Sequence, residues 1–146
     1  MKIEWDEVFL FKFKSLENMK RRIVLTGAFI GMLAIIFGAF GAHLLKKYLS
    51  IEELNTFEVG VRYQMYHALF LLFLSTRKDI AEKTVKTIYN LVVAGVVLFS
   101  GSIYLLATKS LTLFDFKIIV FATPLGGFLL IIAWAVLFLT ILRKKS

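Results

Sequence analysis

Apolar residues along this 146-residue chain are gathered into long blocks and do not alternate with polar ones. A helix that crosses a bilayer needs about 20 mostly apolar residues, and its backbone groups must be satisfied within the helix. Strands of a membrane barrel would instead alternate over about 10 residues. The pattern predicts an all-α fold, an integral membrane four-helix bundle, with spans at residues 23–42, 57–74, 88–107 and 118–142.

The second block is the least apolar of the four. Its stretch VRYQMYHALF, residues 61–70, carries an arginine, a glutamine and a histidine. Just before the block, Ser50 and Glu53 match the capping box, in which each side chain satisfies a backbone amide of the other residue. A helix is therefore expected to begin near Ser50 and to continue into the block.

Basic residues flank the apolar blocks unevenly. Thirteen lysines and arginines lie in the N-terminal region, the connection between the second and third blocks and the C-terminal tail, against four in the other two connections. Because Lys and Arg are enriched in cytoplasmic segments, both termini are expected to be cytoplasmic. Basic residues that set the membrane orientation thus account for the net charge of +8, and no nucleic-acid partner is expected. A cleaved signal peptide is the rival for the first block, whose length exceeds the usual 7–15-residue apolar core.

Composition narrows the chemistry. The chain is 59% hydrophobic and has no cysteine, which excludes disulfides and cysteine metal sites. The two histidines, His43 and His67, lie roughly 15 Å apart in depth at helical rise, too far to ligate one haem together. Zinc lacks a third class of ligand, since the predicted spans contain no cysteine and no H-E-x-x-H motif. Nucleotide-binding, hydrolase and H-E-x-x-H motifs are absent. We expect no metal and no cofactor, assign no catalytic residue, and hold an enzymatic role as the weaker hypothesis.

Polar residues of three blocks fall at similar depth in the predicted outer half of the bilayer. Polar and ionisable groups inside a membrane are a functional hypothesis by default. The alternative is a structural cluster that joins helices, with Arg62 reaching outward to pair with Glu58 four residues earlier. The candidate polar pocket comprises His43, Glu58, Arg62, Tyr63, Gln64, His67, Ser100, Ser102 and Thr123.

Small residues recur at helical spacing in the first block and predict close helix packing. Packing within the chain and a homo-oligomer interface of the G-x-x-x-G kind both remain open. Pro124 is expected to kink the fourth helix and to free the carbonyl of Val120, with Ser100 and Ser102 as candidate partners. The residues assigned to packing or kinking are Gly27, Gly31, Gly38, Gly41, Gly101, Pro124 and Gly126.

Four motifs, GAFGAHLLKKYLS, TFEVGVRYQMYHALFLL, AGVVLFSGSIYLLA and TPLGG, give residues 19–146 a specific resemblance to the YgdD-like small inner-membrane proteins. These form a family of unknown function with eukaryotic transmembrane relatives. The resemblance implies a four-span bundle in the bacterial plasma membrane and no established activity. Carried over by motif, it marks His43, Arg62, Tyr63, Gln64 and His67.

Residues 1–18 depart from that family pattern, which usually begins with a short basic run such as MKRRIVLTG from Met19. The favoured interpretation is an N-terminal extension from a misassigned start, ahead of a membrane domain at 19–146. The alternative is an amphipathic segment lying on the membrane. The alternation of Phe9, Phe11 and Phe13 with Leu10, Lys12 and Lys14 favours a strand over a helix there.

The expected function is that of a small multi-pass plasma-membrane protein with a structural or interaction role, or one that binds lipid or a small molecule. The first alternative is a small transporter or channel component, with Arg62 and His67 along a water-accessible path. The second is a membrane enzyme with His67 as general base. The expected partners are membrane lipid and either a second copy or another membrane protein.

Overall fold

The computed structural model describes residues 5–112 and 119–143. These residues form α1 (Trp5–His43), α2 (Ile51–Thr76), α3 (Glu82–Ala107) and α4 (Ala122–Leu142), with short 3-10 helices η1 (Leu45–Lys47), η2 (Lys109–Leu111) and η3 (Ile119–Phe121). The predicted all-helical fold with four long helices is confirmed.

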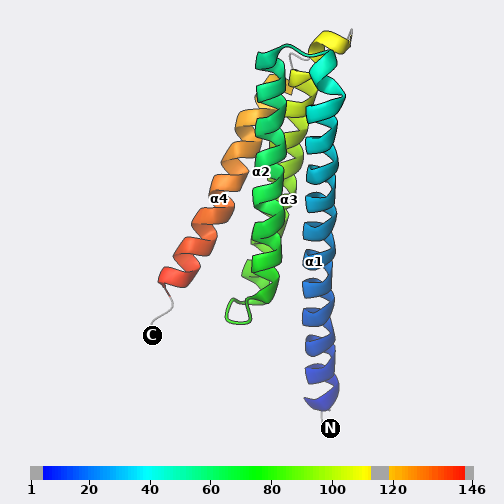
Figure 1. Ribbon diagram of the computed structural model, residues 1–146. Coiled ribbons are helices and arrows are strands. Elements are labelled where there is room, and N and C mark those ends of the chain that lie inside the picture. The colour runs from blue at the N-terminus through cyan, green and yellow to red at the C-terminus, as the bar shows by residue number, and fades with distance from the viewer. Residues whose placement is uncertain (1–4, 113–118, 144–146) are drawn as a thin grey trace.

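The helices pack in the order of the chain. α1 lies along α2, α2 along α3, and α3 along α4 (Figure 1). Within the described residues, α4 comes no closer than 8 Å, between Cα atoms, to α1 or α2. Its C-terminal end leans away from the other helices, and that end of α4 lies at the same end of the molecule as the start of α1.

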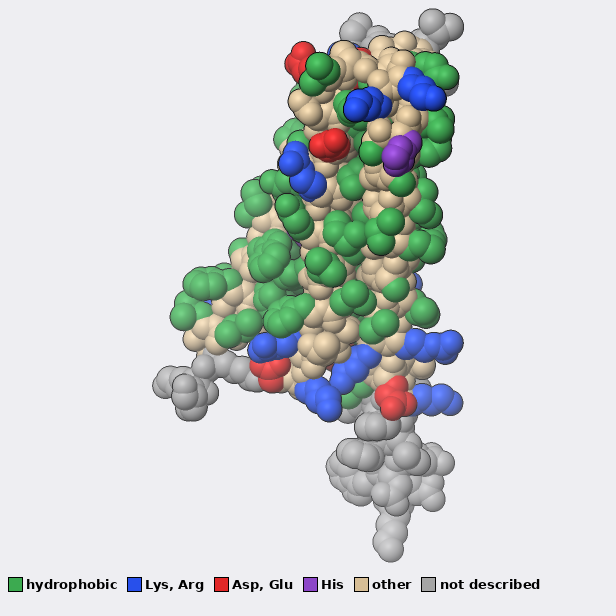
Figure 2. Space-filling view, in the orientation of Figure 1, with side chains coloured by type: hydrophobic (Ala, Val, Ile, Leu, Met, Phe, Trp, Pro, Cys, Tyr) green, Lys and Arg blue, Asp and Glu red, His purple; other side chains and the backbone are tan. Residues whose placement is uncertain are grey.

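Among the described residues, three helical segments are long and apolar enough to cross a membrane. α2 has the length, at 26 residues, but carries Arg62, Gln64 and His67 among its apolar residues. Hydrophobic side chains cover the middle of the face in Figure 2, and charged side chains lie toward its two ends. The qualifying segments are Leu16–Lys47, Glu82–Ala107 and Ile119–Leu142.

The start of α2 is fixed by the predicted capping box. The Glu53 backbone N–H donates to Ser50 Oγ at 3.2 Å, and the Ser50 N–H donates to Glu53 Oε2 at 2.9 Å. The bond from the Ser50 amide, followed by the side chains of Ser110 and Ser50, lowers the pKa of the Glu53 carboxyl below its ordinary value. The capping box is confirmed, and η2 lies beside this end of α2.

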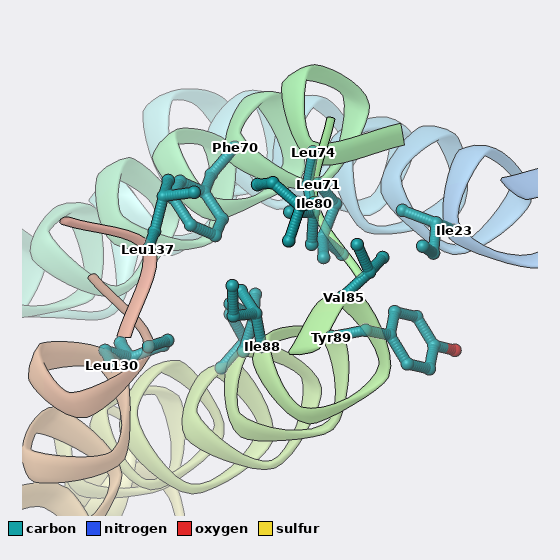
Figure 3. Packing of buried hydrophobic residues seen from close by; sticks show 13 residues of the cluster. Ile23, Phe70, Leu71, Leu74, Ile80, Val85, Ile88, Tyr89, Leu130 and Leu137 are labelled. Atoms are coloured by element: carbon teal, nitrogen blue, oxygen red, sulfur yellow. The ribbon is translucent and has the colours of Figure 1, made fainter. Parts of the chain in front are cut away.

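A buried apolar cluster joins all four helices toward the end that carries the α2–α3 connection (Figure 3). Ile23 of α1, Leu71 and Leu74 of α2, and Ile88 of α3 are fully buried in it. Leu130, Ala133 and Leu137 of α4 complete it. Since lipid is as apolar as these side chains, close packing rather than removal from water stabilises the cluster.

Glycines mark where helix backbones approach each other. A Cβ at Gly27 would lie 3.1 Å from the Ala68 carbonyl oxygen, and one at Gly41 would lie 3.3 Å from the Phe57 ring. Gly31 and Gly38 face α2 in the same way, with Cβ positions 3.5 Å from Ala68 and Val61. The small-residue stripe of α1 is therefore occupied by α2 of the same chain.

The closest approach joins α3 and α4. A Cβ at Gly126 would lie 2.4 Å from the Phe99 backbone nitrogen, and one at Gly95 would lie 2.5 Å from Leu130 Cδ2. Gly101 was also predicted to be a packing residue. It makes no such close approach, since a Cβ there would meet no atom of a neighbouring described element within 4 Å. That assignment is wrong because Gly101 lies on a face of α3 that no described element covers.

Pro124 does not kink the fourth helix. α4 begins at Ala122 after the 3-10 turn η3, which places Pro124 in the first turn of the helix. The first N–H groups of a helix have no intrahelical acceptor, so proline's missing donor costs nothing there. The expected kink is replaced by a change from 3-10 to α-helix before Ala122.

Residues 9–14 are helical, contrary to the strand that their alternation favoured. α1 begins at Trp5 and runs without interruption into the first apolar block. Residues 5–26 contain no glycine or proline. Because helix propagation adds a hydrogen bond for each residue fixed, a segment joined to a long helix continues it at low cost.

The crossing of α3 and α4 can be tested at Gly126. We expect Gly126→Ala to lower the free energy of unfolding by about 1–3 kcal/mol, because its methyl group would overlap the Phe99 backbone. Gly101→Ala adds the same methyl group in open space and gains helix propensity, so its stability should equal or exceed that of the original chain. Thermal unfolding in detergent, followed by circular dichroism, measures both. Equal losses in the two variants would contradict the crossing.

Candidate functional site

Gln64 links three helices from the middle of α2. Its Nε2 donates to the Ile30 carbonyl oxygen of α1 at 2.9 Å, and its Oε1 accepts from the Tyr104 hydroxyl of α3 at 2.7 Å. The side chain is only 4% exposed. An amide without partners in an apolar environment is costly, so these bonds determine which face of α2 turns inward.

His67, one turn further along α2, links this helix to α4. The ring is buried, and Trp134 Nε1 donates to His67 Nε2 at 3.4 Å. Since indole can only donate, Nε2 must be the unprotonated nitrogen, and Nδ1 donates to the Tyr63 carbonyl oxygen at 2.8 Å. Both ring nitrogens of a neutral imidazole are thereby engaged by protein atoms.

Further hydroxyl bonds join the remaining helices. Thr26 of α1 and Tyr89 of α3 are hydrogen-bonded at 3.0 Å. Ser102 Oγ donates to the Phe99 carbonyl oxygen and accepts from the Thr123 hydroxyl of α4 at 2.7 Å. Ser100 Oγ is buried and has no hydrogen-bond partner among the described atoms.

The nine residues of the predicted polar pocket do not form one pocket. The buried face of α2 follows residues 57, 60, 64, 67, 71 and 74, at spacings of three and four. Glu58 and Arg62 fall on the opposite, exposed face, and no ion pair within 4 Å joins these two described residues. His43 is exposed at the end of α1. The inward polar face was correct for Gln64 and His67 and wrong for Glu58 and Arg62.

An open groove does lie between α2, α3 and α4. It arises because α4 touches α3 at Gly126 and then diverges from α2. Aromatic rings bound it, with Tyr63 and Phe99 centroids 4.8 Å apart. Its volume is about 420 Å³, and it is lined by Tyr63, His67, Phe99, Gly127, Leu130, Ile131 and Trp134.

Sequence reasoning found two of these seven residues, Tyr63 and His67. A signal for four of the other five was present in the fourth block, where Gly127, Leu130, Ile131 and Trp134 have the i, i+3, i+4, i+7 spacing of one helix face. The indole N–H of Trp134 could have been recognised as a hydrogen-bond donor for the polar face of α2.

The groove suits an apolar ligand. Its walls are aliphatic and aromatic, and none of its lining side chains is a carboxylate, lysine or arginine. In the described part of the chain, no group of three or more histidine, cysteine, aspartate or glutamate side chains is placed to hold a metal ion. Aromatic walls with a few polar groups at one side are typical of sites that bind small apolar molecules.

Long apolar helices joined by buried polar bonds define an all-helical membrane protein with transmembrane helices. Residues 37–127 match the model of the DUF423 family, described as "Protein of unknown function". The chain belongs to this family, as the resemblance of its motifs indicated.

Relatives from several bacteria carry names of the same kind. A UPF0382 membrane protein of Staphylococcus saprophyticus is 39% identical over 114 residues, covering 78% of this chain and 91% of the relative. YwdK of Bacillus subtilis is 38% identical, covering 76% of this chain and 88% of the relative. The inner membrane protein YgdD of Escherichia coli is 32% identical, covering 86% and 92%. No solved structure matches the chain significantly.

The Gln64 links can be tested by unfolding in mixed micelles. Gln64→Leu should lower the free energy of unfolding by about 1–2 kcal/mol, because it leaves the Tyr104 hydroxyl without its acceptor. A double-mutant cycle with Tyr104→Phe should give a coupling energy of about 0.5–1.5 kcal/mol. Tyr48→Phe, at an exposed tyrosine, is the control and should add independently. Additivity with Tyr104→Phe would contradict the link.

Proposed function

We propose that this chain is a four-span plasma-membrane protein, with both termini in the cytoplasm, that holds the acyl chain of a membrane lipid in the groove between α2, α3 and α4. The observation that carries the proposal is this groove, whose lining includes the buried His67 and the exposed Trp134. Its volume of about 420 Å³ lies within the range of about 300–1,000 Å³ that is usual for ligand pockets.

The helices on either side of α2 support its place as one of the four membrane-spanning helices. It packs along α1 and α3, which are both apolar enough to cross, and its 26 residues would extend about 39 Å at helical rise. Gln64 and His67 are turned into the bundle, which leaves Glu58 and Arg62 as the charged residues that α2 exposes between residues 57 and 74. Arg62 lies on the exposed face of α2, two residues before Gln64, and its long side chain can extend outward toward the headgroups.

The two other functions receive less support from the geometry. A general base needs a ring nitrogen free to take a proton, whereas both nitrogens of His67 bond to protein atoms. A transport path would bring Arg62 and His67 to one channel, whereas they lie on opposite faces of α2. Binding an apolar molecule needs neither arrangement.

The four-span topology can be tested with single cysteines, since the chain has none of its own. We expect Lys47→Cys to react with a membrane-impermeant maleimide in intact cells, because the α1–α2 connection faces outward. Lys78→Cys, in the α2–α3 connection, should react only after permeabilisation. Reaction of both cysteines from the same side would show that α2 does not cross, and the reverse pattern would place the termini outside.

Occupation of the groove can be tested with a phospholipid that carries a photoreactive diazirine in its acyl chain. We expect cross-links at Phe99, Ile131 and Trp134, mapped by mass spectrometry. Gly127→Leu should reduce them about fivefold, the effect of about 1 kcal/mol, because its side chain would extend into the groove.

Gly101→Leu is the matched control, since it adds the same bulk where no described atom lies within 4 Å, and it should leave labelling unchanged. Equal labelling of the groove in the two variants would contradict the proposal. Cross-links from the groove to a second protein chain would assign it to a partner helix instead.

A further inference from the structure

A second cavity, distinct from the groove, lies where the α2–α3 connection meets α1. It has a volume of about 220 Å³ and takes its walls from α1, the end of α2, the connection and the first turn of α3. Its floor is apolar and buried, and is made by Ile23, Leu74, Ile80 and Val85. Lys20 and Lys78 stand at its rim. An apolar floor beneath cationic side chains is the combination found at the headgroup level of a membrane.

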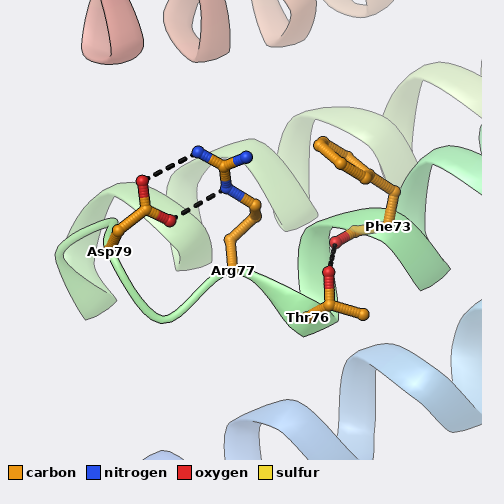
Figure 4. Close-up of polar contacts among 4 residues, drawn as sticks. All are labelled: Phe73, Thr76, Arg77 and Asp79. Atoms are coloured by element: carbon orange, nitrogen blue, oxygen red, sulfur yellow. Dashed lines mark hydrogen bonds and ion pairs between the residues drawn. The ribbon is translucent and has the colours of Figure 1, made fainter.

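Arg77 also lines this cavity, but its charge is already paired with that of Asp79. Its Nε and Nη2 donate to the two carboxylate oxygens of Asp79 at 2.9 and 2.7 Å, and its guanidinium lies 5.5 Å from the Phe73 ring centre (Figure 4). This fork stiffens the connection that carries Lys78. For Lys20 and Lys78 themselves, the described residues provide no ion-pair partner within 4 Å.

The remaining electrostatics of the cavity favour an anion. α3 begins beside it after Ala81, whose side chain cannot cap the helix, and a helix N-terminus carries a partial positive charge. The lining includes one carboxylate, that of Glu82 in the first turn of α3. The positive charges of the two lysines and the partial positive charge of the helix end therefore exceed the negative charge of the Glu82 carboxylate.

We propose that this cavity binds a phosphate group carried by an anionic phospholipid, with Lys20 and Lys78 contacting the phosphate and the apolar floor contacting the glycerol and upper acyl carbons. The ammonium groups are compact charges on flexible stems, suited to phosphate oxygens at several angles. The floor is continuous with the apolar cluster of the helices, which distinguishes a lipid from a free phosphate ion as the occupant.

The experiment is native mass spectrometry of the whole chain released from detergent, with phosphatidylglycerol, phosphatidylcholine, glycerol 3-phosphate or inorganic phosphate added in separate samples. We expect one phosphatidylglycerol to be retained in preference to phosphatidylcholine. Each basic residue at a membrane surface changes such binding about fivefold, so Lys20→Gln with Lys78→Gln should weaken it about 25-fold.

The matched control is the pair Lys83→Gln and Lys86→Gln, which removes the same charge from exposed positions near the start of α3 outside the cavity. It should retain most of the preference for phosphatidylglycerol. Equal losses in the two double variants would overturn the proposal in favour of diffuse surface charge. Equal retention of the two lipids would also overturn it, and so would saturation by inorganic phosphate without any preference for phosphatidylglycerol. Labelling of the separate groove depends on none of these outcomes.

Discussion

The rest of the structure depends on a rule of the hydrocarbon phase: a polar group inside it must find its partner within the protein. The Gln64 carboxamide meets that rule by bonding to the Ile30 carbonyl on one side and to the Tyr104 hydroxyl on the other. α2 is thereby held between α1 and α3. The least apolar helix lies between two others, so its inward polar side chains are shielded from lipid on both sides.

Glycines then set how closely the neighbours approach. Along α1 the glycine stripe gives α2 room over the length of the contact, whereas α3 and α4 meet closely around Gly95 and Gly126. α4 packs on α3 from Gly126 to Leu137, while its C-terminal end leans away from the other helices (Figure 1). The groove follows from this difference, and it opens on the side of α2 where His67 needs a partner that α3 does not supply.

Much of this arrangement could be predicted from the sequence, because membrane helices are recognised by length and apolarity and the capping box by its spacing. The inward position of Gln64 and His67 also followed from their character. Arg62 and Glu58 were misplaced because depth alone does not specify a helix face, which the spacing of apolar residues around them does. The groove could not be predicted, since it depends on the angle between α3 and α4.

α4 packs along α3 over much of its length and has few ties to α2. Ser102 and Thr123 bond near its start, and further along it reaches α2 through a Trp134–His67 bond of 3.4 Å, at the long end of the usual range, and through the packing of Phe70 on Trp134. A molecule in the groove would contact α4 where these ties are fewest. Its occupation and the position of α4 are therefore coupled, because contacts made by an acyl chain favour the arrangement that leaves the groove open. For a family without a known reaction, the proposed coupling between an apolar ligand and the position of α4 is a more direct route to function than any single reactive group.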